Sequence, residues 1–169
     1  MNKIFWKHFI HNEWKLYMAA TEKGLCYIGS PNKPFEEMKA WLTKRFPKME
    51  LVGNDEEVEV YINQIQEYLD GDRSEFTIPV DLKGTTFQLA VWDALTKIPY
   101  GENKSYSDIA NMIQNPKAVR AVGAAIGSNP ILMTIPCHRV VAKNGALTGF
   151  RGGLEMKVIL LELESRINK

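Results

Sequence analysis

The segment TIPCHRVVAKNG, residues 134–145, places a cysteine between a proline and a histidine. A thiol that loses its proton to a nearby imidazole is a nucleophile, whereas a buried thiol behaves as a small apolar side chain. Side chains of adjacent residues diverge on a helix or strand, which disfavours a direct bond between Cys137 and His138. Pro136 favours a turn instead, in which a water molecule can bridge thiol and imidazole. Both interpretations of Cys137 stay open at this point, whereas Cys26, in the apolar stretch GLCYIG, is predicted to be a buried structural thiol.

Composition narrows the classes of protein that can carry such a cysteine. The chain has 169 residues, 45% of them hydrophobic and 24% charged, as expected for a globular protein of one or two domains. No apolar run approaches the roughly 18 residues of a membrane span, and charges interrupt the N-terminus too often for a signal peptide. The two cysteines are far apart, which argues against a disulfide framework or a zinc site. We therefore expect a cytoplasmic protein, or a nuclear one in a eukaryote, with no metal and no membrane partner.

The charge is distributed unevenly between the two halves of the chain. Residues 1–82 carry 10 Lys and Arg against 14 Asp and Glu, a net of −4. Residues 83–169 carry 11 against 6, a net of +5. This asymmetry favours a polyanionic partner for the C-terminal half.

The N-terminal half, residues 1–82, is predicted to be an α/β domain with a small antiparallel sheet. Residues 3–29 mix aromatic and β-branched residues with polar ones, and HNE at 11–13 fits a hairpin loop. Helices are predicted over 34–47 and over 54–71, the second capped by Asn54 and ended by Gly71. Extended structure resumes at 75–80, and we place the domain boundary near residues 81–84.

The C-terminal half, residues 83–169, is predicted to be mostly helical. Ser105 caps a short helix with Asp108 three residues later, and a second helix follows with Asn115 as its cap and Pro116 at its first position. Two short helices joined this closely indicate a helix-turn-helix. Asn144-Gly145 predicts a β-hairpin. Together with helices predicted over 85–99 and 152–166, this gives a winged helix-turn-helix domain and an α+β fold class for the whole chain.

The motifs around Cys137 resemble those of the O6-alkylguanine-DNA alkyltransferases, the methylated-DNA–protein-cysteine methyltransferases. The similarity covers residues 83–164 as an ordered series: FQLAVWDALTKIPYGENKSY, RAVGAAIGSNP, IPCHRVV and NGALTGFRGGLEMK. The N-terminal half matches the ribonuclease-H-like domain of the family only loosely, through TEKGLCYIGSP. The resemblance implies a DNA repair protein that flips O6-alkylguanine, and also O4-alkylthymine, out of duplex DNA. The alkyl group then passes irreversibly to Cys137, once per molecule.

The resemblance also implies how the protein holds double-stranded DNA. Arg120 matches the arginine that replaces the flipped guanine in the base stack, and Tyr106 matches the tyrosine that crowds the phosphate and donates to the guanine ring. The small residues Ala121, Gly123 and Ala124 suit close docking of their helix in the minor groove. Little sequence preference is expected from such contacts.

The catalytic roles follow from the same resemblance. Cys137, His138 and Glu164 match a cysteine–water–histidine–glutamate relay, and Asn129 matches the asparagine that braces the turn before the cysteine. We expect Arg139 to form a structural ion pair. The product is a thioether, from which nothing regenerates the thiol. The resemblance implies neither a metal nor an organic cofactor, and the protein is expected to act as a monomer.

The substrate pocket implied by the resemblance contains Val140, Phe150, Arg151 and Lys157. The carbonyls of Cys137 and Val140 accept from the guanine amino group. Phe150 stands where many relatives have a tyrosine, so its ring packs on the base without donating, and the backbone N–H of Arg151 serves the guanine oxygen. Two alternatives remain from the residues alone: a non-catalytic DNA-binding module for alkylated bases or regulation, and a Cys–His hydrolase.

Overall fold

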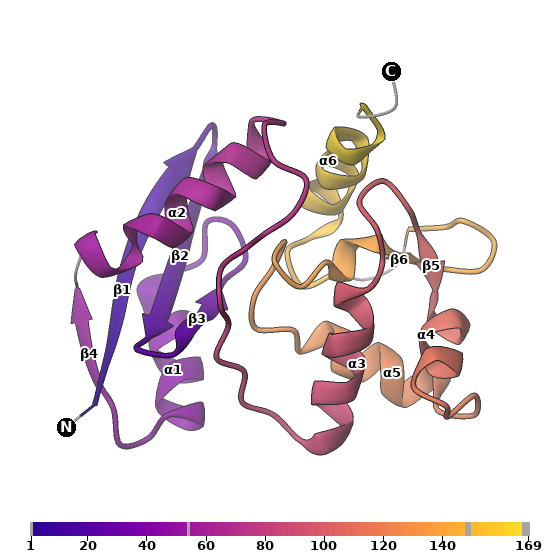
Figure 1. Ribbon diagram of the computed structural model, residues 1–169, viewed down its shortest axis with the longest axis horizontal. Coiled ribbons are helices and arrows are strands. Elements are labelled where there is room, and N and C mark those ends of the chain that lie inside the picture. Colours follow the sequence, from indigo (N-terminus) through magenta and orange to yellow (C-terminus); the bar gives the residue numbers. More distant parts are fainter. Residues whose placement is uncertain (1, 54, 148–149, 167–169) are drawn as a thin grey trace. The chain divides into compact units, whose positions relative to one another are not determined.

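The computed structural model describes residues 2–53, 55–147 and 150–166, and Asn54, the predicted helix cap, lies outside them. By its internal contacts the chain divides into two compact units, Met1–Lys83 and Gly84–Lys169 (Figure 1). Each unit is described by itself below.

A four-stranded sheet forms the centre of the first unit. Its order is β3-β2-β1-β4, with the strands at Lys3–His11 (β1), Trp14–Thr21 (β2), Gly24–Ile28 (β3) and Glu50–Gly53 (β4). The pairs β1–β2 and β2–β3 are antiparallel, which confirms the predicted antiparallel sheet. The short strand β4 was not predicted; it pairs with β1 in parallel at the sheet edge.

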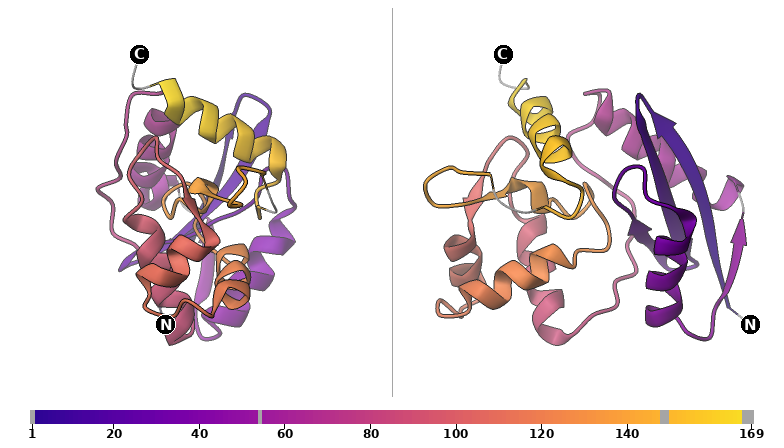
Figure 2. Two further views of the ribbon diagram at one scale, coloured as in Figure 1. Left: turned by 90° about the vertical axis from the view of Figure 1, so that its right-hand side faces the viewer. Right: turned by 180° about the vertical axis from the view of Figure 1, so that it is seen from behind.

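Two helices cover opposite faces of this sheet, as Figures 1 and 2 show. Helix α1, Phe35–Arg45, buries Met38 and Leu42 in a core that includes Ile4 and Cys26. Helix α2, Asp55–Leu69, has an apolar stripe that is buried at Val58, Ile62, Ile65 and Leu69. Both helices lie where the sequence predicts them.

Gly71 ends α2 as predicted. Its φ is +82°, a left-handed conformation that glycine adopts without strain. The N–H of Asp72 reaches back to the Glu67 carbonyl at 2.8 Å, and the N–H of Gly71 donates to the Tyr68 carbonyl at 3.1 Å. These bonds satisfy the last carbonyls of the helix in a Schellman motif.

The segment predicted to be extended at 75–80 makes a single bridge with the sheet, between Val80 and Leu25. The N–H of Leu25 donates to Pro79 and the N–H of Asp81 donates to Leu25. Thr21 adds a buried hydrogen bond from Oγ1 to Oδ2 of Asp81 at 2.6 Å. These contacts hold the end of the first unit on strand β3.

The second unit is mostly helical. Its elements are α3 (Thr86–Thr96), β5 (Lys104–Ser105), α4 (Tyr106–Met112), α5 (Val119–Gly127), the 3-10 helix η1 (Cys137–Arg139), β6 (Val140–Val141) and α6 (Leu154–Ser165). The predicted capping box of Ser105 and Asp108 is present at the start of α4. Helix α3 also begins with a capping box, and its buried Trp92 donates to the Ala125 carbonyl in α5 at 2.9 Å. The helix-turn-helix is therefore formed by α4 and α5 and packed on α3.

The predicted start of α5 at Pro116 is wrong. After the end of helix α4, Gln114 lies in the left-handed region, φ +60°, and the N–H of Asn115 donates back to the Ala110 carbonyl. The Asn115 carbonyl in turn accepts from Ala118 at 3.0 Å. Asn115 is thus part of the C-terminal cap of α4 and of the following turn, so α5 begins only at Val119 and has no side-chain cap.

The predicted hairpin at Asn144-Gly145 is also wrong among the residues described up to Leu147. Gly145 does form a turn, with φ +82°, and Ala142 donates to Ala146 at 3.1 Å. Val140–Val141, however, pairs in parallel with Lys104–Ser105. No second strand follows the turn among the residues described up to Leu147, and residues 148 and 149 of the predicted hairpin lie outside the described residues.

Candidate active site

Cys137 begins the 3-10 helix η1, directly after Pro136, so the predicted turn is confirmed. Its side chain is buried, with 1% of its surface exposed. Its N–H donates to the Ile135 carbonyl at 2.7 Å. The thiol is therefore held at a fixed point of a tight turn.

Asn129 holds this turn from within. Its side chain is fully buried, and Nδ2 donates to the Ile135 carbonyl at 2.8 Å and to Sγ of Cys137 at 3.1 Å. Its Oδ1 accepts from the N–H of Ile131 at 3.0 Å. One amide group thus forms hydrogen bonds near both ends of the segment 131–137 and also with the sulfur of Cys137.

Burial raises the pKa of the Cys137 thiol. The hydrogen bond from Asn129 and the positive charges of Arg151 and Lys157 act in the opposite direction but do not outweigh burial. The thiol is therefore protonated at neutral pH, and a base is needed to generate the thiolate nucleophile.

Glu164, from helix α6, joins the two residues that follow the cysteine. Its Oε2 lies 2.6 Å from Nε2 of His138, and its Oε1 accepts from Nε of Arg139 at 2.8 Å. A second guanidinium nitrogen of Arg139 donates to Oε2 at 3.0 Å. All three side chains are buried. The ion pair expected for Arg139 is present, and its partner is the same carboxylate that binds His138.

Burial is the largest influence on the His138 imidazole and lowers its pKa. Glu164 acts in the opposite direction through its hydrogen bond and its charge. The imidazole is therefore neutral at neutral pH, the form that can accept a proton. Because Glu164 binds Nε2, the ring nitrogen that can take this proton is Nδ1.

Val140 links the cysteine turn to the helix-turn-helix. It follows η1, its N–H donates to the Cys137 carbonyl, and it pairs with Lys104 one residue before the cap of α4. Its own carbonyl accepts from Nζ of Lys157 at 2.7 Å. Burial lowers the pKa of this Lys157 ammonium, which the cysteine partly opposes. The carbonyls of Cys137 and Val140 each retain a second lone pair for a ligand.

The exposed surface of α5 is made of small residues and one arginine. Arg120, Ala121 and Ala124 are exposed, while the opposite face of the helix is buried. Gly123 faces α4, since a Cβ there would lie 3.9 Å from the Tyr106 ring. A flat surface of this kind can approach a rigid partner closely.

The turn Phe150–Gly153 precedes α6 and is closed by a hydrogen bond from the Gly153 N–H to the Phe150 carbonyl at 2.9 Å. Gly152 has no room for a side chain: a Cβ would lie 2.4 Å from the Phe150 ring and 2.6 Å from Sδ of Met156. Sequence reasoning did not single out Gly152, although the pair Gly152-Gly153 before a helix was a signal.

We expect Gly152→Ala to lower the free energy of unfolding by about 1–3 kcal/mol, because the Phe150 and Met156 side chains must shift to admit the methyl group. Denaturant unfolding followed by tryptophan fluorescence measures this change. Gly127→Ala is the matched control, since a Cβ there meets nothing within 4 Å. Equal stability of the two variants would contradict the close packing at Gly152.

The structure brings six of the predicted residues into one buried cluster: Cys137, His138, Glu164, Asn129, Val140 and Lys157. Phe150 and Arg151 are half-buried beside it, in the turn before α6. Arg120, Ala121 and Ala124 lie apart from the cluster on the exposed face of α5, with Tyr106 at the start of α4. Among the described residues, no group of three His, Cys, Asp or Glu side chains could hold a metal ion.

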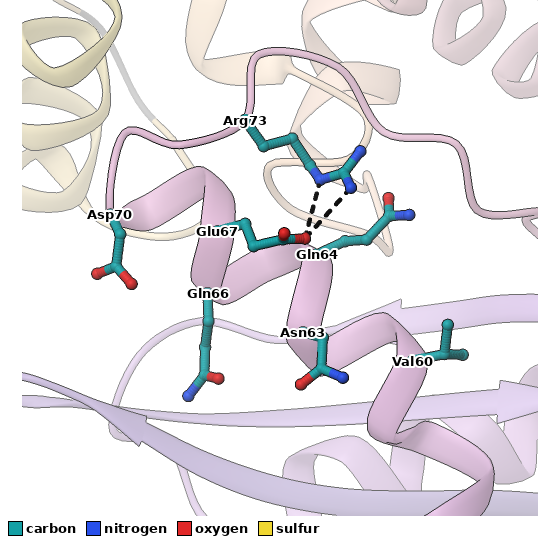
Figure 3. Close-up of a pocket in the computed structure, with 7 residues that line it drawn as sticks. All are labelled: Val60, Asn63, Gln64, Gln66, Glu67, Asp70 and Arg73. Atoms are coloured by element: carbon teal, nitrogen blue, oxygen red, sulfur yellow. Dashed lines mark hydrogen bonds and ion pairs between the residues drawn. The ribbon is translucent and has the colours of Figure 1, made fainter.

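A separate hollow of about 540 Å³ lies on the outer surface of α2 (Figure 3). Its floor is polar, and Arg73 binds Glu67 across it at 3.2 Å. Gln64, also in its lining, makes two hydrogen bonds with Thr77, at 2.8 and 3.0 Å. These bonds attach the segment after α2 to the helix, and the hollow contains none of the residues predicted to be catalytic.

Comparison with known proteins gives matches along both units. The sequence profile described as "6-O-methylguanine DNA methyltransferase, DNA binding domain" matches residues 86–166. The one described as "6-O-methylguanine DNA methyltransferase, ribonuclease-like domain" matches residues 12–82. Among the described residues, no helix has the length and apolar character that crossing a membrane requires.

Several individual proteins are similar over nearly the whole chain. An inducible methylated-DNA–protein-cysteine methyltransferase of Bacillus subtilis is 58% identical over 163 residues, which cover 96% of this chain and 91% of the relative. A Methanosarcina acetivorans methylated-DNA–protein-cysteine methyltransferase is 40% identical, over 88% of this chain and 90% of its own. The crystal structure of the Mycobacterium tuberculosis OGT in complex with DNA is 36% identical with a TM-score of 0.80, over 95% of this chain and 92% of that one.

Proposed function

The chain belongs to the 6-O-methylguanine DNA methyltransferase family, and on that premise we propose that it repairs O6-alkylguanine in duplex DNA by transferring the alkyl group irreversibly to Cys137. The observation that carries this proposal is the buried thiol of Cys137, which accepts a hydrogen bond from Asn129. The next residue in the chain, His138, is paired with the buried carboxylate of Glu164. O4-alkylthymine, which presents a similar alkylated oxygen, is a second substrate under the same proposal.

His138 is the base in this reaction. Its neutral imidazole accepts the thiol proton through a bridging water, and Glu164 stabilises the imidazolium that forms. The thiolate then attacks the alkyl carbon, the bond from that carbon to O6 breaks with its electron pair, and N1 of the guanine gains a proton. Because the resulting thioether has no carbonyl for water to attack, the thiol is not regenerated and each molecule acts once.

Helix α5 is the proposed DNA-binding element. Its exposed Ala121 and Ala124, with Gly123 beside Tyr106, let the helix backbone approach the minor groove without side chains in between. Arg120 enters the stack in place of the flipped base, and Tyr106 crowds the phosphate and donates to the guanine ring. Such contacts read the shape of DNA more than its sequence.

The flipped guanine binds against the turn and strand around the cysteine. Its amino group donates to the carbonyls of Cys137 and Val140, each of which has a second lone pair besides the hydrogen bond that it already accepts. The Phe150 ring packs on the base, and the backbone N–H of Arg151 donates to the oxygen. All of these groups come from one unit of one chain, which supports action as a monomer.

The direct test is incubation with duplex DNA that contains O6-methylguanine, followed by intact-protein mass spectrometry and peptide mapping. We expect a gain of one methyl group per protein molecule, located on Cys137. Unchanged protein mass despite DNA binding would overturn the proposal in favour of a non-catalytic alkylated-base-binding or regulatory protein. Repeated turnover would overturn it in favour of a hydrolase.

We expect Arg120→Ala to slow repair of O6-methylguanine in duplex DNA at least tenfold, because the variant has no side chain to fill the gap left by the flipped base. Reaction with free O6-benzylguanine, which needs no base flipping, should change less than twofold. Single-turnover kinetics with both substrates measure the difference, and Lys39→Ala, an exposed residue of α1, is the control for loss of one charge. Equal slowing with both substrates would contradict the role of Arg120.

A further inference from the structure

The chain makes a tight turn on a left-handed glycine shortly after helix α3. Residues 99–102 form a β-turn that is closed by a hydrogen bond from the Glu102 N–H to the Pro99 carbonyl at 3.1 Å. Gly101, at the third position, has φ +83°, which is characteristic of a type II turn and favours glycine. The turn lies between α3 and β5 in the second unit, and it contains none of the residues proposed above for alkyl transfer or DNA binding.

This turn reaches the buried carboxylate that binds His138. The Gly101 N–H donates to Oε1 of Glu164 at 3.3 Å, and the same oxygen accepts from Nε of Arg139 at 2.8 Å. Oε2 of Glu164 lies 2.6 Å from Nε2 of His138 and accepts from a second nitrogen of Arg139 at 3.0 Å. The donors on Oε1 limit the rotation of the carboxylate, so they help to determine where Oε2 lies relative to the imidazole.

The same segment holds Arg139, the ion-pair partner of the carboxylate. Nη1 of Arg139 donates to the Ile98 carbonyl at 2.6 Å. The centroid of the Tyr100 ring lies 5.6 Å from the guanidinium carbon, which is within the range of a cation–π interaction. Residues 98–101 therefore contact both members of the buried pair, one through a backbone N–H and the other through a carbonyl and a ring.

We propose that Tyr100 and Gly101 are positioning residues for alkyl transfer, and that their turn holds the Arg139–Glu164 pair in the orientation that places Oε2 of Glu164 against His138. This proposal rests on the proposed function, in which His138 takes the thiol proton. Both residues act through the carboxylate that stabilises the imidazolium, and not on the alkyl group itself. Because a hydrogen bond weakens as its geometry departs from the optimum, a displaced turn weakens the bond to His138 even in a folded protein.

The test replaces Gly101 with two residues that differ in their tolerance of a positive φ. Valine strongly disfavours this conformation, whereas asparagine adopts it more readily than most residues. We expect Gly101→Val to slow single-turnover methyl transfer from O6-methylguanine in duplex DNA about tenfold, the effect of one lost hydrogen bond to a charged group. Gly101→Asn should retain most of the rate. Tyr100→Leu should slow transfer about threefold through loss of the cation–π interaction, and Tyr100→Phe, which keeps a ring, should restore it.

Nuclear magnetic resonance of the imidazole groups separates positioning from a general loss of structure. The chain has 3 histidines, so selective nitrogen-15 labelling isolates the signal of His138, which is assigned by its absence in His138→Phe. The Nε2 proton is deshielded by its short hydrogen bond to Glu164, and we expect it to move upfield in Gly101→Val but not in Gly101→Asn. Gly71→Val is the matched control, because Gly71 has φ +82° in the first unit; it should change neither the rate nor the resonance.

An unmoved His138 resonance in Gly101→Val would overturn the proposal, as would the same loss of rate in Gly71→Val, which would indicate general destabilisation. If Gly101→Val does not fold, Tyr100→Leu provides the decisive measurement, and an unmoved resonance there would overturn the proposal. Failure of the unmodified protein to gain a methyl group would overturn the proposed function instead. The resonance would still show whether the turn orients Glu164, so the two failures are distinguishable.

Discussion

Cys137→Ala is expected to abolish methyl transfer completely while duplex DNA is still bound. The sulfur is the only atom of the cluster proposed to form a bond with the alkyl carbon, and a methyl group cannot replace it. Binding is expected to persist because the proposed DNA-contacting residues lie on α4 and α5, outside the cysteine turn. Intact-protein mass spectrometry measures the transfer, and fluorescence anisotropy with a labelled duplex measures the binding.

Cys26→Ala is the matched control for this experiment. Cys26 is also buried, its Sγ lies 3.4 Å from the Ala19 carbonyl, and burial together with the charge of Asp81 raises its pKa. It belongs to the core of the first unit, and its removal should leave the full gain of one methyl group. Any methylation of Cys137→Ala, or loss of methylation in Cys26→Ala, would show that the acceptor has been assigned to the wrong cysteine.

Glu164→Ala is expected to have the largest effect on stability, about 3–5 kcal/mol lower free energy of unfolding. Its carboxylate is the partner of the buried Arg139 guanidinium, and the variant leaves that charge in the interior without its counter-ion. Methyl transfer should also slow at least tenfold, because the imidazolium of His138 loses the group that stabilises it. Urea unfolding and single-turnover kinetics measure the two effects.

Glu162→Ala, an exposed residue on the same helix, is the control and should change stability by less than about 0.5 kcal/mol. Replacement of Glu164 by glutamine separates the two effects, because an amide oxygen still accepts from Arg139 but carries no charge. We expect this variant to be more stable than Glu164→Ala and still slow in transfer. A Glu164→Ala protein as stable as Glu162→Ala would contradict the buried ion pair.

Several elements of the second unit could be predicted from residues that are close together in the sequence. Ser105 and Asp108 form their capping box within four residues, and Pro136 sets up the turn at Cys137 through its own fixed φ. The two errors both arose from tertiary or unusual backbone structure. Gln114 adopts a positive φ that a non-glycine residue rarely takes, and Val140 pairs with a strand that lies far away along the chain.

The candidate site likewise combines features that the local sequence predicts with tertiary contacts that it does not predict. The turn at Cys137 could be predicted from its neighbours, but Glu164 is 26 residues from His138 and looks like an ordinary surface glutamate on an amphipathic helix. Only the resemblance to a family singled it out. Nothing in the local sequence indicated that Arg139 and His138 would share one carboxylate, because that depends on how α6 packs against η1.

The pairing of β5 with β6 has a consequence for how the flipped base is positioned. Only two residues on each strand take part, yet they place Val140 opposite Lys104, two residues before Tyr106. Under the proposed function, β6 carries the carbonyl of Val140 that accepts from the guanine amino group. The paired strand β5 leads directly to Tyr106, which donates to the guanine ring. The two backbone pairs therefore fix the separation of these two groups, and with it the position of the base between them.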